Sequence, residues 1–278
     1  MMRNLKMGTY YRAVFCGFLS ATTLVGLPAA HAADGGPVDG GTHVSSVETE
    51  SPENSVILSF RLGLQAYKKG QKDEAFEAYR AAADQGHSGA RWKLAHMYAE
   101  GDGTPEDDYR AFQLFEEIVQ EGATPGSREQ AFIANALVSL AGYFQAGIPG
   151  TPVEPDPMRA RDLYWLAATN FGEPHAQFEI GLYHLGDGSN RNGQRQAARW
   201  FNQAAQKGHA GAKAMLGKLY FQSGRTVAGL ALLTEALEIA AGSDRMWIRG
   251  LQEGAFAVSS EGERRKAVSM VESRLASK

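Results

Sequence analysis

Apolar residues recur every three or four positions through most of the chain, and short glycine-rich or proline-rich breaks separate these stretches. Such spacing places the apolar side chains on one face of an α-helix. Four stretches align on an opening alanine, at Ala90, Ala136, Ala176 and Ala212. The columns that follow are Leu94, Leu140, Ile180 and Leu216, then Ala95, Ala141, Gly181 and Gly217, then the rings Tyr98, Phe144, His184 and Tyr220. The small residues mark where a neighbouring helix approaches closely.

A second helix with its own apolar stripe belongs to each of these units. Its markers are Ala75, Ala111, Ala160 and Ala197, followed four residues later by Tyr79, Phe115, Tyr164 and Phe201. The glycines expected to end units are Gly86, Gly122, Gly172, Gly208 and Gly242, at spacings of 36, 50, 36 and 34 residues. A single helical hairpin cannot bury its apolar face, but stacked hairpins can. The sequence therefore predicts an all-α solenoid of about five hairpins over residues 55–242, with one concave and one convex surface.

Residues 243–278 predict a C-terminal helical cap, made of one helix or of a helix pair that breaks near residues 259–262. A polar outer face on such a cap would keep the end of the array soluble. A second contact surface is the alternative role for this tail. Between Gly147 and Met158 four prolines predict an extended, solvated loop that accounts for the longer third unit.

The first 32 residues have the features of a cleaved secretion signal. Three basic residues and no acidic one precede an apolar run over residues 13–27, which is too short to cross a bilayer comfortably. A small-residue motif follows, and we expect cleavage between Ala32 and Ala33; an uncleaved anchor helix is the alternative. Residues 33–54, rich in glycine and acidic side chains, predict a disordered acidic tether. The location expected for the mature chain is the periplasm.

Cleavage would remove Cys16, the sole cysteine, and leave 246 residues without a disulfide, a thiol nucleophile or a thiolate metal ligand. The formal charge would change from −3 to −6. A net negative charge disfavours nucleic acid and anionic membrane surfaces as partners. With no other apolar segment of spanning length, we expect no membrane insertion after cleavage. A protein or a neutral ligand fits these features better.

A search for catalytic motifs finds no phosphate-binding loop, no zinc-protease motif and no nucleophile elbow. We therefore predict a protein that is not an enzyme, with no catalytic residue, no cofactor and no metal site. Pairs of acidic residues fall at helix starts or on polar faces, where solvation explains them. His87, His175 and His209 fall in turns between units and are far apart in sequence, so we interpret them as separate turn residues.

The repeated columns resemble those of the Sel1-like repeat proteins, relatives of the tetratricopeptide repeats. The unit from Ala90 to Gly122 keeps the family's order of alanines, rings and turn glycines, and the segment from Gln206 to Ala212 is a typical junction. The resemblance covers residues 56–242. The order of signal, acidic tether, repeats with a proline-rich insert and charged tail is similar to the ExoR-type periplasmic regulators of α-proteobacteria. That resemblance implies inhibition of a two-component sensor histidine kinase, through its periplasmic domain, and negative regulation of exopolysaccharide synthesis.

Candidate partner-binding residues lie on the first helices, which line the concave side of such arrays. Trp92 and Phe178 each stand two residues beyond an opening alanine, and His96 and Leu182 follow them by four residues. Large rings dominate binding energy at protein interfaces, which makes Trp92 and Phe178 the expected anchors. The alternative is that both rings belong to the core.

His184 is a candidate pH-sensitive residue because it replaces a ring in the aromatic column. If it were buried and neutral, acid would destabilise the fourth unit. If it were exposed, it would titrate alike in the folded and unfolded states. Two alternatives to kinase regulation also stay open on the sequence, namely a general scaffold or adaptor of the cell envelope and a cell-wall-associated enzyme.

Overall fold

The computed structural model describes residues 52–186 and 190–276, and this part of the chain contains twelve α-helices and no strand. Their bounds are α2 Pro52–Lys68, α3 Lys72–Asp84, α4 Ser88–Glu100, α5 Asp108–Glu121, α6 Glu129–Ala146, α7 Pro157–Asn170, α8 Pro174–Gly186, α9 Arg191–Gln206, α10 Ala210–Gln222, α11 Thr226–Ile239, α12 Asp244–Ala257 and α13 Glu261–Ala276. The predicted all-α fold class is confirmed. The predicted cleavage site at Ala32 and Ala33, and the acidic tether up to residue 51, lie outside the described residues.

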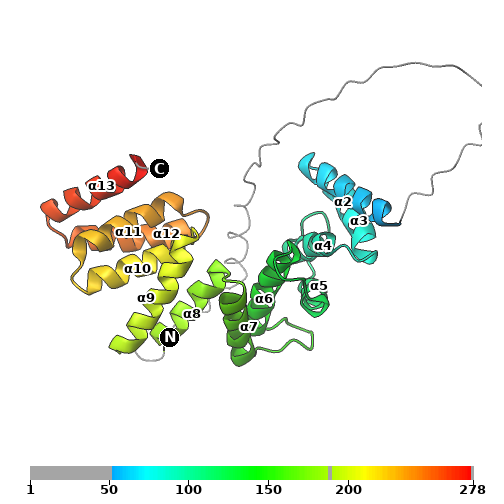
Figure 1. Ribbon diagram of the computed structural model, residues 1–278, viewed down its shortest axis with the longest axis horizontal. Helices are drawn as coiled ribbons and strands as arrows, with labels where there is room; N and C mark the ends of the chain where they lie inside the picture. The colour runs from blue at the N-terminus through cyan, green and yellow to red at the C-terminus, as the bar shows by residue number, and fades with distance from the viewer. Residues whose placement is uncertain (1–51, 187–189, 277–278) are drawn as a thin grey trace, which may run out of the picture.

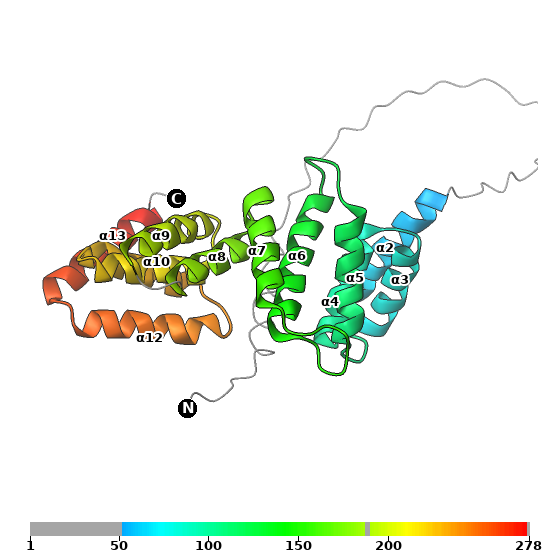
Figure 2. The same cartoon turned by 90° about the horizontal axis from the view of Figure 1, so that it is seen from below.

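Successive helices form hairpins that stack along a curved array (Figure 1). The N-terminal hairpins and the C-terminal hairpins form the two arms of an arch, and α7 and α8 lie between them. The perpendicular view shows the same order of helices from α2 at one end to α13 at the other (Figure 2). The tail folds as the pair α12 and α13. The first helix begins at Pro52, three residues earlier than the sequence predicted.

Helix starts and stops follow from local chemistry. Side chains of Asp107, Asp156 and Asn190 accept hydrogen bonds from backbone N–H groups in the first turns of α5, α7 and α9, which would otherwise lack partners. The glycines expected to end units all have positive φ, between 54° and 88°. Only glycine adopts that conformation without strain, so the chain can reverse there.

Between the helices of each hairpin the core combines a small residue with a large ring. The four opening alanines are fully buried, and so are the rings of Tyr79 and Phe201. A Cβ atom added to Gly63 would lie 2.6 Å from the ring of Tyr79, and one added to Gly181 would overlap the ring of Phe201. Gly181, from the predicted small-residue column, and Gly63, in the hairpin before the aligned units, therefore let the two helices of their hairpins approach closely.

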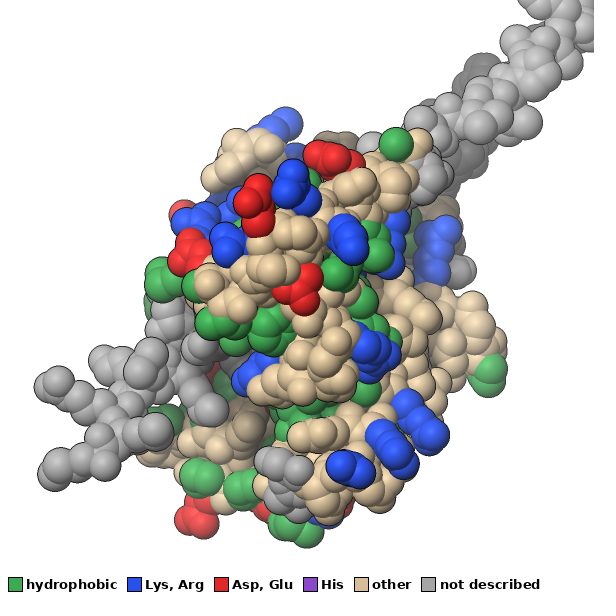
Figure 3. All heavy atoms as spheres, turned by 90° about the vertical axis from the view of Figure 1, so that its left-hand side faces the viewer, with side chains coloured by type: hydrophobic (Ala, Val, Ile, Leu, Met, Phe, Trp, Pro, Cys, Tyr) green, Lys and Arg blue, Asp and Glu red, His purple; other side chains and the backbone are tan. Residues whose placement is uncertain are grey.

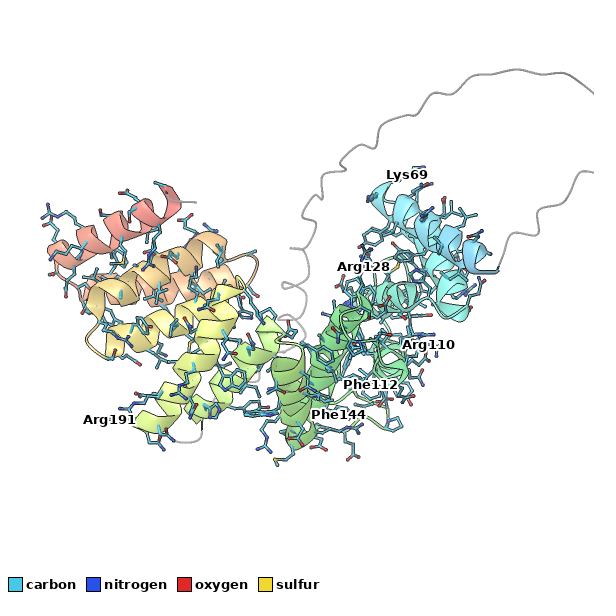
Figure 4. All side chains as sticks on the ribbon, viewed as in Figure 1. Lys69, Arg110, Phe112, Arg128, Phe144 and Arg191 are labelled. Atoms are coloured by element: carbon cyan, nitrogen blue, oxygen red, sulfur yellow. The ribbon has the colours of Figure 1, made fainter. Side chains whose placement is uncertain are left out.

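Rings also join neighbouring hairpins. Phe112 of α5 and Phe144 of α6 meet edge to face with centroids 5.5 Å apart, and Figure 4 labels both at the lower end of these helices. The guanidinium of Arg159, from α7, lies 4.0 Å from the centre of the Phe144 ring. This stack ties three successive helices together at the bottom of the arch.

The proline-rich insert differs in part from the prediction of an extended, solvated loop. Ile148 and Val153 are buried, and the Ile148 N–H donates to the Val153 carbonyl at 2.8 Å. The Asp156 N–H donates to the carbonyl of Phe144 at 2.6 Å, just before α7 begins. Two apolar side chains thus fasten the insert to the core, and its exposed tip is the short turn over residues 149–152.

Candidate functional site

Four first helices, α4, α6, α8 and α10, present a partly exposed surface that we call the first-helix face. It is formed by the positions three and six residues beyond each opening alanine, which the helical period places away from the buried stripe. These positions hold Lys93, Ser139, Glu179 and Met215, then His96, Gly142, Leu182 and Lys218. All except Ser139 and Gly142 are half-buried. The face runs along both arms of the array and has mixed polarity.

In the N-terminal arm, Trp92 and His96 meet at one asparagine of the next unit. The Trp92 Nε1–H donates to Asn135 Oδ1 at 2.6 Å, and His96 Nε2 lies 2.9 Å from the same oxygen. Trp92 also contacts the ring of Phe132, at 5.6 Å between centroids. Burial lowers the pKa of His96 to about 4, against the hydrogen bond to Asn135, which raises it. These residues join α4 to α6 while part of each ring stays on the surface.

In the C-terminal arm, Phe178 stacks on His209 with centroids 4.7 Å apart and the rings inclined by 24°. Phe178 also lies 5.8 Å from the buried ring of Phe201. Leu182, one turn further along α8, packs with Phe178 against the apolar cluster of α9 and α10 that contains Phe201. The structure therefore brings Phe178 and Leu182 together on α8, and Trp92 and His96 together on α4. Whether they bind a partner stays a prediction.

The expectation that the distance in sequence keeps His175 and His209 apart is wrong, although His209 does lie at the junction before α10. His175 Nδ1 lies 3.3 Å from His209 Nε2, although the two residues are 34 positions apart. His209 Nδ1 accepts the Ala212 N–H at 3.1 Å, so in the neutral ring Nε2 carries the proton and donates to His175. Burial lowers the pKa of both rings, to about 4 for His175 and about 3 for His209. The repeat length could have indicated this pair, because residues one unit apart occupy equivalent places in adjacent hairpins.

Two charged groups on the first-helix face are poorly solvated. Burial raises the pKa of the Glu179 carboxyl to about 7, and its Oε1 lies 3.8 Å from His175 Nε2. Burial lowers the pKa of Lys93, whose ammonium lies 5.0 Å from the centre of the Trp92 ring. Nothing in the sequence pattern distinguished these two residues from solvated charges.

His184 is half-buried on α8. Tyr98 and Phe144 of its column contact the rings of Phe76 and Phe112, whereas no ring contact joins His184 to another of the described residues. Its role as a pH-sensitive residue stays a prediction.

Two further features concern possible ligands and membranes. Within residues 52–186 and 190–276, no three His, Cys, Asp or Glu side chains converge to form a potential metal site. None of the helices in these ranges has the length and hydropathy needed to cross a bilayer.

Comparison with known proteins identifies the repeats and two similar chains. The Sel1 repeat family matches at residues 59–87, 88–122, 134–170 and 174–209. An exopolysaccharide production negative regulator of Rhizobium leguminosarum bv. viciae is 49% identical over 221 residues, which cover 79% of this chain and 82% of the relative. A protein of the same description from Rhizobium meliloti is 48% identical, with 78% and 81% of the two chains covered.

A solved structure shares the fold. It is the protective antigen c5321 of uropathogenic Escherichia coli, described as having an SLR fold, with a TM-score of 0.61 and 23% sequence identity. The match covers 81% of this chain and 46% of that protein. At this identity the similarity concerns the arrangement of the helices.

Proposed function

This chain belongs to the Sel1 repeat family, and from that premise we propose that it is a negative regulator of exopolysaccharide production that acts by binding another protein. The observation that carries the proposal is the near 50% identity, over about four fifths of both chains, to two regulators of that description. The stacked hairpins support a binding role, since such arrays offer extended surfaces to other proteins.

The first-helix face is the surface we propose for this binding. Six of its eight positions are partly exposed, and two of its charged groups, Lys93 and Glu179, have lost much of their hydration. Trp92 and Phe178, which border this face on α4 and α8, are the proposed anchors, with His96 and Leu182 of the face beside them. Aromatic rings at the centre of an interface contribute much of the binding energy because they bury a large area at low entropy cost.

The partner we propose is the periplasmic domain of a membrane sensor kinase, which the chain would hold inactive. The basic and apolar leader, with its expected cleavage between Ala32 and Ala33, supports a periplasmic location. We propose no catalytic role for the chain.

Gene deletion tests the regulatory role. Deleting the gene should raise exopolysaccharide output, and the full chain supplied from a plasmid should restore it. A chain without residues 1–32, confined to the cytoplasm, should fail to restore it. Unchanged output after deletion would overturn the regulatory role, and rescue by the leaderless chain would overturn the periplasmic location.

Cross-linking tests the partner and the surface. A photoreactive amino acid in place of Leu182 should cross-link to a membrane histidine kinase in intact cells, and the same group in place of Arg80, an exposed residue of α3, should not. Deleting that kinase gene should also abolish the rise in exopolysaccharide caused by loss of the regulator. Exclusive cross-linking to non-kinase envelope proteins would favour a general scaffold instead.

A further inference from the structure

A pocket of about 510 Å³ opens where α8, α9 and α10 meet. Leu185, Met215 and Leu219 supply its apolar walls, and Gln194, Lys218 and Gln222 supply its polar groups. Met215 and Lys218 belong to the first-helix face. Its volume lies in the range of pockets that bind small ligands and side chains.

Lys218 gives the pocket a charge preference. The side chain is half-buried and forms no ion pair with any residue that the structure describes. A partly desolvated cation gains from an opposite charge, provided that both groups leave water in good geometry. Two amide side chains beside it can donate further hydrogen bonds to a carboxylate.

The surroundings of the pocket are basic as well. Helix α9 carries Arg191, Arg195 and Arg199 and no acidic residue, and Figure 4 labels Arg191 at the free end of that helix. Residues 171–278 contain 14 Lys and Arg against 10 Asp and Glu, a net charge of +4, whereas residues 52–170 contain 11 against 17, a net charge of −6. Lys and Arg side chains are spread over the C-terminal side of the molecule, including a lower right region without visible acidic side chains (Figure 3).

We propose that this pocket binds an apolar side chain of the partner protein that is flanked by acidic residues. The apolar walls exclude water around that side chain, while Lys218 and the arginines of α9 select the acidic neighbours. The inference rests on the proposed protein-binding function and adds the chemistry of the segment that is bound. A nucleic acid would use the charge of the site but not its apolar walls.

Peptide titration tests the pocket in the chain without its leader. The probe is an acetylated and amidated pentapeptide with a central leucine between glutamates and aspartates. One control peptide has glycine in place of leucine, and another has lysines in place of the acidic residues. Binding is followed by the NMR signal of the Met215 methyl group, assigned with the Met215→Leu variant.

The acidic leucine peptide should shift the Met215 signal in a saturable way, and both control peptides should bind at least about tenfold more weakly. Lys218→Glu should weaken binding about tenfold or more, whereas Lys266→Glu, the same charge change on the exposed side of α13, should leave it unchanged. Circular dichroism of both variants checks that the helices are intact. Equal binding of the lysine peptide, an unaffected Lys218→Glu variant, or no shift at millimolar peptide would overturn the proposal.

Two further measurements are needed. One distinguishes a partner protein from a second copy of this chain as the occupant of the pocket, and the other distinguishes failure of the pocket proposal from failure of the regulatory role. If Lys218→Glu converts a dimer into a monomer in sedimentation velocity, the occupant is a second copy of this chain and the proposal is wrong. If Lys218→Glu abolishes peptide binding yet still represses exopolysaccharide production fully, the partner does not use the pocket, although the regulatory role stands. Unchanged exopolysaccharide output after gene deletion would instead refute the regulatory role by itself.

Discussion

The two arms of the array are built from the same repeat but are connected differently inside. From α2 to α8 the buried side chains form one continuous apolar cluster, whose members run from Ala66 to Ile180. Beyond that point the core divides into a small cluster around α9 and α10 and another around α11, α12 and α13. A shared repeat pattern in the sequence therefore does not guarantee equal packing between units.

Helix α8 is where the two arrangements meet. Its Ala176 and Ile180 belong to the continuous N-terminal cluster, whereas Phe178 and Leu182 pack with the cluster of α9 and α10. Since stability in repeat arrays is a sum of unit and interface terms, we expect the C-terminal arm to open at a lower free energy than the N-terminal arm.

The test with the largest expected effect on this difference removes one buried ring from each arm. Phe115→Ala and Phe201→Ala should each cost about 3–5 kcal/mol, because both rings are almost fully buried. Hydrogen exchange should show the loss of protection spread over α2–α8 in the first variant and confined to α8–α13 in the second. Equal loss of protection along the whole chain in both variants would show that the arms are one cooperative unit.

A second test adds a methyl group at a point of close approach between two helices in each arm. Gly63→Ala and Gly181→Ala should lower the free energy of unfolding by about 1–3 kcal/mol, because the new methyl group would collide with Tyr79 or Phe201. Gly250→Ala on α12 is the control, since its added Cβ meets nothing within 4 Å. It should raise stability by up to about 1 kcal/mol. Urea denaturation measures all three, and an unchanged Gly181→Ala midpoint would refute the tight packing of α8 on α9.

Acid provides a third test, because each arm buries histidine and the buried carboxyl of Glu179, in the C-terminal arm, opposes the effect of the histidines. The depressed pKa values of His96, His175 and His209 mean that the unfolded chain binds more protons than the folded chain below about pH 6.5. Their stabilising contribution is therefore complete above that pH and is lost as the pH falls toward their folded values of about 3 to 4. Glu179 has the opposite effect on how stability depends on pH. Burial raises its pKa to about 7, so the folded chain takes up this proton at a higher pH than the unfolded chain does.

Glu179→Gln should consequently stabilise the fold at neutral pH and make the loss of stability between pH 7 and pH 5 steeper, by roughly 1–2 kcal/mol. His96→Asn, in the N-terminal arm, should make that loss shallower. His184→Phe tests the candidate pH-sensitive residue in the same assay, which measures urea unfolding as a function of pH. An unaltered pH dependence in Glu179→Gln would show that this carboxyl does not oppose the histidines.

The smallest effects concern one ion-pair network in each arm. Asp102 accepts the Tyr67 hydroxyl at 2.6 Å and pairs with Lys72 at 3.0 Å, while Glu235 pairs with Lys213 at 3.1 Å and with Arg274 at 2.6 Å. Asp102→Asn and Glu235→Gln should each cost about 0.5–1 kcal/mol, and high salt should reduce the difference. Since Arg274 lies on α13, Glu235→Gln should also speed hydrogen exchange there, and unchanged exchange would indicate that the bridge does not hold the last helix.

The sequence predicted the helices because each column of the repeat reports one local property, such as a small residue, a ring or a turn glycine. It did not predict contacts between units, which depend on how one hairpin lies on the next. Asn135 illustrates this, since nothing in its position before Ala136 indicates that it accepts hydrogen bonds from Trp92 and His96. Ile148 and Val153 were concealed by the prolines around them, although an apolar pair in a polar loop is a sign of burial.

The junctions between hairpins decide the direction in which the array grows. His87 and His209 each accept the backbone N–H three residues later and stack on a ring of the preceding first helix, Phe60 or Phe178. One imidazole thereby contacts two successive units. At the start of α8, between the two arms, the carboxylate of Glu173 accepts the Ala176 N–H instead, so this junction uses a different residue type. Exchanging the junction residues Glu173 and His209 would therefore test whether these caps influence how one hairpin packs on the next.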